Sequence, residues 1–121
     1  MKVKEFFDKA IAVGRARDPR GEKGLEAYLQ REKTVYEETP EAKKGLFDLE
    51  RLSNPYHDTR ILNGPEDAEV KTIMVGVDLE VGELLLADRL RERGTPVDLC
   101  VAHHPEGYAQ ANLFRVMAVS Y

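Results

Sequence analysis

The chain has little that would anchor it in a membrane or cross-link it. It contains one cysteine among 121 residues, so no disulfide can form within it. No apolar run approaches the roughly 18 residues that a membrane-spanning helix needs. Residues 1–8 carry charged side chains where a signal peptide would have its apolar core. These absences predict a soluble globular protein in a cytoplasmic setting.

Positive charge is also in short supply. Lysine and arginine number 18 against 22 aspartates and glutamates, which gives a net charge of −4. A protein that binds nucleic-acid phosphates needs a basic face, so nucleic acid is not expected to be the main partner. The length fits a single domain, and the 42% hydrophobic content is enough for one modest core.

Common catalytic arrangements are missing as well. Gly76 and Gly82 lack the lysine and the spacing of a phosphate-binding P-loop. Ser53 and Ser120 have no base at an informative spacing, so a hydrolase triad has no support. A zinc finger built on cysteine pairs is excluded by the single cysteine.

What the chain does have is a strand–helix–strand pattern. Residues 71–77 and 97–102 are apolar runs without clean alternation, as expected for strands covered on both faces. Between them an apolar stripe recurs at helical spacing, and Gly94 follows as a stop signal. The stripe consists of Val81, Leu84, Leu85, Ala87 and Leu90. The pattern predicts an α/β fold with a parallel βαβ unit, in which Leu85→Ala would cost about 2–5 kcal/mol.

Two helices are predicted before this unit, over residues 2–16 and 22–38. The charged run at 31–33 in the second helix is typical of a solvated face. Residues 59–62 suit a short strand, and residues 113–119 suit a last helix. Two polar side chains are expected to be N-caps, because they can accept hydrogen bonds from free backbone N–H groups; these are Asp48 and Asn112.

The most reactive residues follow the two predicted strands. Asp78 comes directly after the first strand, and His103-His104-Pro105-Glu106 follows the second. The carboxyl ends of parallel strands lie at one edge of a sheet, where open α/β folds build their sites. Imidazole together with carboxylate suits Zn, Fe, Ni or Mn. The sequence therefore predicts a divalent-metal site with His103 and His104 as ligands.

Other roles stay open for these residues and their neighbours. The histidines could instead end the strand, one facing solvent and one hydrogen-bonded. Asp78 could be a ligand, or the N-cap of the helix that begins near Glu80. Glu106 could carry a proton or be a plain loop carboxylate. His57 and Asp58 could add ligands, although a polar loop of this kind is usually surface.

At these motifs the sequence resembles the Nif-three-like family, the Ngg-interacting-factor proteins, also labelled GTP cyclohydrolase type-two homologues. The resemblance rests on Val-Gly-Val-Asp-Leu-Glu-Val-Gly-Glu at 75–83 and Val-Ala-His-His-Pro-Glu at 101–106. Residues 58–64 are similar, less closely, to an early Asp-Asn-x-Gly-Leu-x-x-Gly segment of that family. The similar region spans residues 54–110.

The resemblance implies an α/β fold, a dinuclear metal site and assembly into homo-oligomeric rings, commonly hexamers. His103 and His104 match the family's first two metal ligands. The family takes an aspartate and a further histidine and glutamate from later segments. Against that pattern the 121 residues are either the N-terminal fragment of a longer protein, which the uncapped pattern at 113–119 favours, or a protein with an incomplete site. This chain alone is expected to hold metal weakly or not at all.

Three functions remain as hypotheses. The first is a two-metal hydrolase, in which Asp78 would orient a ligand and Glu106 would carry a proton. The second is a non-catalytic metal-binding or adaptor protein forming a ring, which needs the same ligands. The third is an Asp-His-His phosphoesterase, and it is the most distant because Ala102 stands where that family has aspartate.

Overall fold

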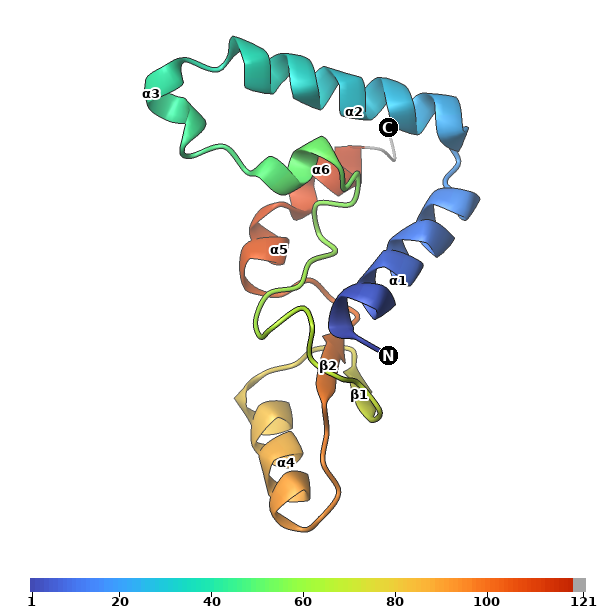
Figure 1. The fold of residues 1–121 in the computed structure, drawn as a ribbon, viewed down its shortest axis with the longest axis vertical. Coiled ribbons are helices and arrows are strands. Elements are labelled where there is room, and N and C mark those ends of the chain that lie inside the picture. The colour runs from blue at the N-terminus through green and yellow to red at the C-terminus, as the bar shows by residue number, and fades with distance from the viewer. Residues whose placement is uncertain (119–121) are drawn as a thin grey trace. The chain divides into compact units, whose positions relative to one another are not determined.

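The computed structural model describes residues 1–118. The predicted helix end at Val119, and Ser120, therefore lie outside the described residues. Figure 1 shows helices α1 (Val3–Arg17), α2 (Gly21–Glu38), α3 (Glu41–Lys44), the 3₁₀ turn η1 (Leu49–Leu52), β1 (Ile73–Gly76), α4 (Val81–Glu92), β2 (Leu99–Ala102), α5 (Gly107–Ala111) and α6 (Leu113–Met117). The elements form two compact units, one of residues 9–57 and one of the residues flanking them.

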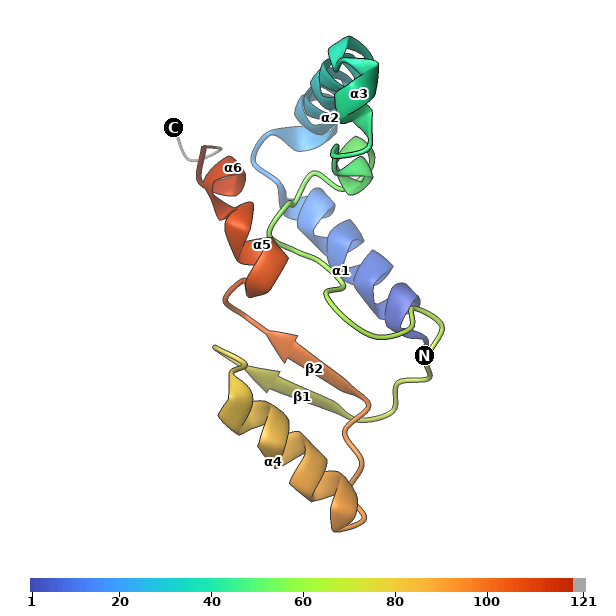
Figure 2. The same cartoon turned by 90° about the vertical axis from the view of Figure 1, so that its left-hand side faces the viewer.

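In the flanking unit, β1 and β2 make a two-stranded parallel sheet joined through α4. Ile73 pairs with Leu99 and Gly76 with Ala102, and the two arrows run in the same direction in Figure 2. The two predicted N-terminal helices, α1 and α2, precede this βαβ unit together with the short α3 and η1, so the predicted α/β fold is confirmed. β1 is shorter than predicted at both ends, whereas β2 begins later than predicted and ends at Ala102, as predicted.

Local sequence signals set the ends of α4. The Glu80 side chain accepts from the backbone N–H of Glu83, and the Glu83 carboxylate accepts from the N–H of Glu80 at 3.0 Å, which is a reciprocal capping box. Gly94 follows the helix with a φ of +83°, a conformation that favours glycine. Glu80 is therefore the N-cap, and the alternative in which Asp78 caps this helix is wrong.

The apolar stripe of α4 is not buried. Val81 is 71% exposed and Leu85 63%, and no element of the described chain covers this side of the helix. β1 alternates between exposed and half-buried residues, so the prediction that it is covered on both faces is wrong. The burial of Leu85, on which the predicted cost of Leu85→Ala was based, is also wrong, and an exposed position is expected to change stability by less than about 0.5 kcal/mol.

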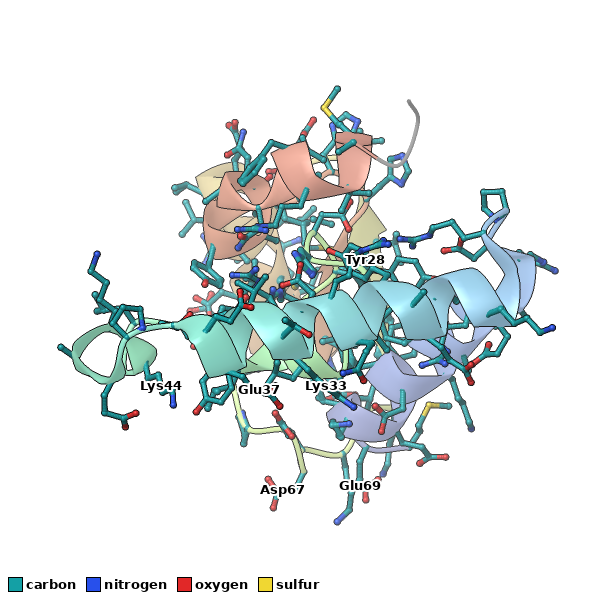
Figure 3. The ribbon with its side chains drawn as sticks, turned by 90° about the horizontal axis from the view of Figure 1, so that it is seen from above. Tyr28, Lys33, Glu37, Lys44, Asp67 and Glu69 are labelled. Atoms are coloured by element: carbon teal, nitrogen blue, oxygen red, sulfur yellow. The ribbon has the colours of Figure 1, made fainter. Side chains whose placement is uncertain are left out.

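The segment before β1 is held by the start of α1. Lys2 forms an antiparallel bridge with Glu69, and the N–H of Val70 donates to the carbonyl of Met1 at 2.6 Å. Figure 3 labels Glu69 in this segment. Residues 59–62 form no strand, so that prediction is wrong; the bridge in the segment before β1 is made by Glu69. Val70 is buried here.

In the unit of residues 9–57, α2 has a buried side that carries charge. Glu32 is almost fully buried, and its carboxylate pairs with the guanidinium of Arg51 in η1. The predicted solvated face at 31–33 is therefore wrong at Glu32. Lys33 and Glu37 are exposed and lie on the side of α2 away from Tyr28 (Figure 3).

The two predicted cap residues precede their short helices, and one of them makes the capping hydrogen bond. The Asp48 carboxylate accepts from the N–H of Glu50 at 3.2 Å, which confirms it as the N-cap of η1. Asn112 is the residue at the N-cap position of α6, as predicted, but its side chain makes no capping hydrogen bond; its amide donates instead to the carbonyl of Tyr108 at 3.0 Å. No helix in residues 1–118 is long and apolar enough to cross a membrane.

Candidate functional site at the strand ends

The two histidines follow β2, and their backbone continues the pairing with Gly76 and Val77 at the end of β1. The N–H of His103 donates to the carbonyl of Gly76 at 2.9 Å, and the N–H of His104 donates to that of Val77 at 2.8 Å. The two imidazole rings lie side by side, with centroids 5.3 Å apart and planes tilted by 35°. Both histidines are exposed, so a ligand from solvent can reach them.

Asp78 reaches His104 from the end of the neighbouring strand. Its Oδ1 lies 2.9 Å from Nδ1 of His104, and both side chains are more than half exposed. An ionised carboxylate can only accept, so Nδ1 is the donor. With the proton on Nδ1, Nε2 of the neutral ring keeps its lone pair for a metal or a proton.

Gly76 makes this approach possible. A Cβ at Gly76 would lie 2.6 Å from the carbonyl oxygen of Asp78 and 3.1 Å from the Leu79 side chain. The chain therefore turns back closely over the last residue of β1, and only glycine leaves room for it. This turn carries the Asp78 carboxylate to His104. The Gly-Val-Asp motif is visible in the sequence, but the steric reason why position 76 must be glycine is seen only in the structure.

Glu106 connects the two strand-end loops. Its Oε1 accepts from the N–H of Leu79 at 3.4 Å, and its own carbonyl accepts from the N–H of Ala109 in α5 at 2.9 Å. Glu106 is half-buried. The carboxylate is thus directed toward the loop that carries Asp78, and both acids predicted as catalytic candidates are part of this cluster.

His57 belongs to the unit of residues 9–57 and is completely buried there. Its Nε2 lies 3.2 Å from the hydroxyl of Tyr28, and the two rings are 5.8 Å apart. The expectation that the His57-Asp58 loop is plain surface is therefore wrong at His57. No local pattern in the sequence indicates this contact, because Tyr28 lies 29 residues away.

We call Asp78, His103, His104 and Glu106 the strand-end cluster. Its residues fit a metal ion only in part. Two adjacent imidazoles are suitable ligands, but the Asp78 carboxylate is already bound to His104. Within residues 1–118, no group of three or more His, Cys, Asp or Glu side chains could hold a metal ion. Structural and catalytic zinc sites use at least three protein ligands. The described residues therefore do not form a complete metal site.

A second polar cluster escaped the sequence-based predictions. Nε and Nη2 of Arg20 donate to the two carboxylate oxygens of Asp18 at 2.9 and 2.8 Å, and the Tyr56 hydroxyl donates to Asp18 Oδ2 at 3.1 Å. The bonds from Arg20 hold the pKa of Asp18 well below its usual range. Burial, and then the bond to Asp18, raise the pKa of Tyr56 to about 12.

This second cluster holds the α1–α2 turn to the segment before residue 57. The Asp18 side chain is only 4% exposed, and all of its bonds in the cluster come from within residues 9–57. Gly14 leaves room for the Tyr56 ring, since a Cβ there would lie 3.1 Å from it. We therefore assign the cluster to stability.

Comparison of the chain with protein-family models, curated proteins and solved structures finds no match.

Proposed function

We propose that the strand-end cluster binds a divalent metal and takes part in metal-dependent hydrolysis. His103 and His104 would supply imidazole ligands, with Nε2 as the coordinating atom of His104. The observation that carries the proposal is the 2.9 Å bond from His104 Nδ1 to Asp78. Metal-binding histidines usually donate their other ring N–H to a carboxylate or carbonyl in this way.

The roles of the acids follow from their contacts. Asp78 keeps the proton on Nδ1 of His104 and orients the ring, so it acts through His104 and not as a ligand. Glu106 holds the N–H of Leu79 and so supports the loop that carries Asp78. A bound divalent ion would supply an acidified water and charge stabilisation for hydrolysis.

The number of metal ions and the hydrolytic activity are supported by the family resemblance. Gly-Val-Asp at 76–78 and His-His-Pro at 103–105 are the motifs that carry it. Two imidazoles are too few for tight binding. We therefore propose that the chain alone binds one ion weakly, and that a dinuclear site needs further ligands.

Metal titration tests the proposal. Co²⁺ absorption spectra would be recorded for the wild type, the double variant His103→Ala with His104→Ala, Asp78→Asn and Asp67→Asn. We expect weak binding that the double variant abolishes and Asp78→Asn reduces by roughly 10–100-fold. Asp67→Asn is the matched control, since Asp67 is an exposed carboxylate outside the cluster, and it should bind as wild type does.

Stability in chelator separates ligands from structural histidines. Both histidines are exposed, so the double variant should unfold at nearly the wild-type temperature without metal. Buried structural histidines would instead leave unsatisfied partners at about 1–3 kcal/mol each. A large loss of metal-free stability with Co²⁺ binding intact would refute the ligand assignment.

A non-catalytic metal-binding protein remains the second candidate, because it needs the same two ligands. Turnover distinguishes the two. Phosphate esters and cyclic amides would be assayed with and without added metal, using the double histidine variant as the blank. Metal-dependent turnover that the blank lacks would support hydrolysis, and metal binding without turnover of any substrate would favour the binding protein.

A further inference from the structure

A hollow of about 260 Å³ lies between α4 and β2, and we call it the α4–β2 hollow. Leu84 and Ala87 line it from one face of the helix, and Val97 and Leu99 line it from the segment that enters β2. These four side chains give the hollow an apolar lining. Pockets for drug-sized ligands measure roughly 300–1,000 Å³, so a hollow of this size suits a smaller molecule.

Three charged side chains border the apolar lining. Asp88 and Arg91 lie three residues apart on α4, and Asp98 directly precedes β2. Oδ2 of Asp98 accepts from the N–H groups of Lys71 and Thr72 at 2.9 and 2.8 Å, whereas no hydrogen bond from the described residues reaches its Oδ1. The bonds from Thr72 and Lys71, and then the charges of Lys71 and Arg91, lower the pKa of Asp98, so an ionised carboxylate lies near the guanidinium.

The charges and the apolar lining together are complementary to one class of ligand. A simple anion would be attracted by Arg91 but repelled by the two aspartates, and a simple amine would meet the opposite forces. A free amino acid carries both a carboxylate, which a guanidinium binds through two parallel hydrogen bonds, and an ammonium group, whose donors suit carboxylate oxygens. We propose that the α4–β2 hollow binds a free amino acid with an apolar side chain. Its carboxylate lies on Arg91, its ammonium group on Asp88 and Oδ1 of Asp98, and its side chain on the apolar lining.

The native thiol provides a direct test. Cys100, the single cysteine, also lines the hollow and is half-buried, so a bound ligand should shield it from alkylation by iodoacetamide. L-leucine is the probe, and chelator is present so that metal plays no part. We expect half-protection in the millimolar range, because exposed ion pairs contribute little. At about ten times that concentration the rate should fall about tenfold, since only the empty protein reacts.

Glutathione alkylated under the same conditions controls for effects of L-leucine on the reagent, and its rate should not change. An unchanged alkylation rate of Cys100 up to the solubility limit of L-leucine would overturn the proposal.

Analogues test the assigned contacts in the wild-type chain. N-acetyl-L-leucine lacks the ammonium group, L-leucinamide lacks the carboxylate, and glycine lacks the apolar side chain. Each should therefore protect Cys100 less well than L-leucine does. Protection by L-leucinamide or N-acetyl-L-leucine equal to that by L-leucine would refute the assignment of a zwitterionic ligand.

A matched pair of variants tests the role of the guanidinium. Arg91→Gln should raise the concentration of L-leucine needed for half-protection about fivefold, the upper end expected for an exposed ion pair. Arg89→Gln is the control, because Arg89 lies on the same helix but pairs with Glu92 and is not among the lining residues; it should behave as the wild type does. The same half-protection concentration in Arg91→Gln as in the wild type would overturn the proposal.

Discussion

The carboxylate of Asp78 accepts a hydrogen bond from Nδ1 of His104 across 26 residues of sequence and the ends of two parallel strands. Neither group is buried, so the bond contributes little to folding. Its effect is on the imidazole, whose proton and orientation it sets. This is the relationship on which the proposed function depends most directly.

Asp78→Asn should change the tautomer of His104 without unfolding the chain. In the wild type the neutral ring carries its proton on Nδ1, because an ionised carboxylate can only accept. An amide at position 78 can donate as well as accept, so the preference should be lost. Nitrogen chemical shifts of His104 at alkaline pH report the tautomer. The free energy of unfolding should change by no more than about 1 kcal/mol, and an unchanged tautomer would contradict the assignment.

Gly76→Ala should disturb both the fold and the cluster. The added methyl would lie 2.6 Å from the backbone oxygen of Asp78, and a backbone atom cannot move aside cheaply. We expect a loss of about 1–3 kcal/mol in the free energy of unfolding, as for other overpacked sites. The signals of His104 should shift too. Gly82→Ala is the control, since a Cβ there meets nothing within 4 Å and a helical Gly→Ala change gains about 0.5–1 kcal/mol.

The stability of the unit of residues 9–57 should fall at acid pH because of Asp18. The folded pKa of Asp18 lies below its ordinary value of 3.8, so its contribution is complete above about that pH. It is lost as the pH falls from there through the lowered folded pKa. Denaturation of the wild type and Asp18→Asn between neutral pH and strong acid measures this contribution. Equal acid dependence in both proteins would contradict the role of Asp18.

Tyr56 should make the stability of the folded chain depend on pH in the alkaline range. Its pKa is raised from 10.0 to about 12, so folding favours the neutral phenol. The contribution is complete below the unfolded value and is lost as the pH rises through the folded value. Tyr56→Phe should remove this alkaline dependence. At neutral pH it should cost about 1.5–3 kcal/mol, because the lost hydrogen bond is to the ionised carboxylate of Asp18, and a steeper alkaline loss in the variant would contradict the prediction.

Glu32→Ala should be among the more damaging single changes on α2. It leaves the Arg51 guanidinium nearly buried without its carboxylate, and breaking such pairs costs about 3–5 kcal/mol. Lys33→Ala, one residue on, is the matched control because Lys33 is exposed; it should change the free energy of unfolding by less than about 0.5 kcal/mol. Urea denaturation compares the two, and equal small losses would show that the Glu32–Arg51 pair is solvated.

The sequence by itself determined the features that depend on near neighbours. Helical spacing and Gly94 located α4, and two apolar runs around it indicated the parallel strands. Strand direction then placed Asp78 and the two histidines at one edge of the sheet. These inferences succeed because periodicity and capping are set by residues within a few positions of one another, and because two strands joined by one helix nearly always form a right-handed parallel crossover.

Tertiary structure alone decided which side chains are partners and which are buried. Asp78 bonds to His104 26 residues away, His57 lies against Tyr28 29 residues away, and Glu32 meets Arg51 19 residues away. The stripe on α4 likewise showed which residues are apolar but not whether anything covers them. Burial and pairing depend on where distant segments of the chain lie in the folded protein. A local sequence pattern does not contain that information.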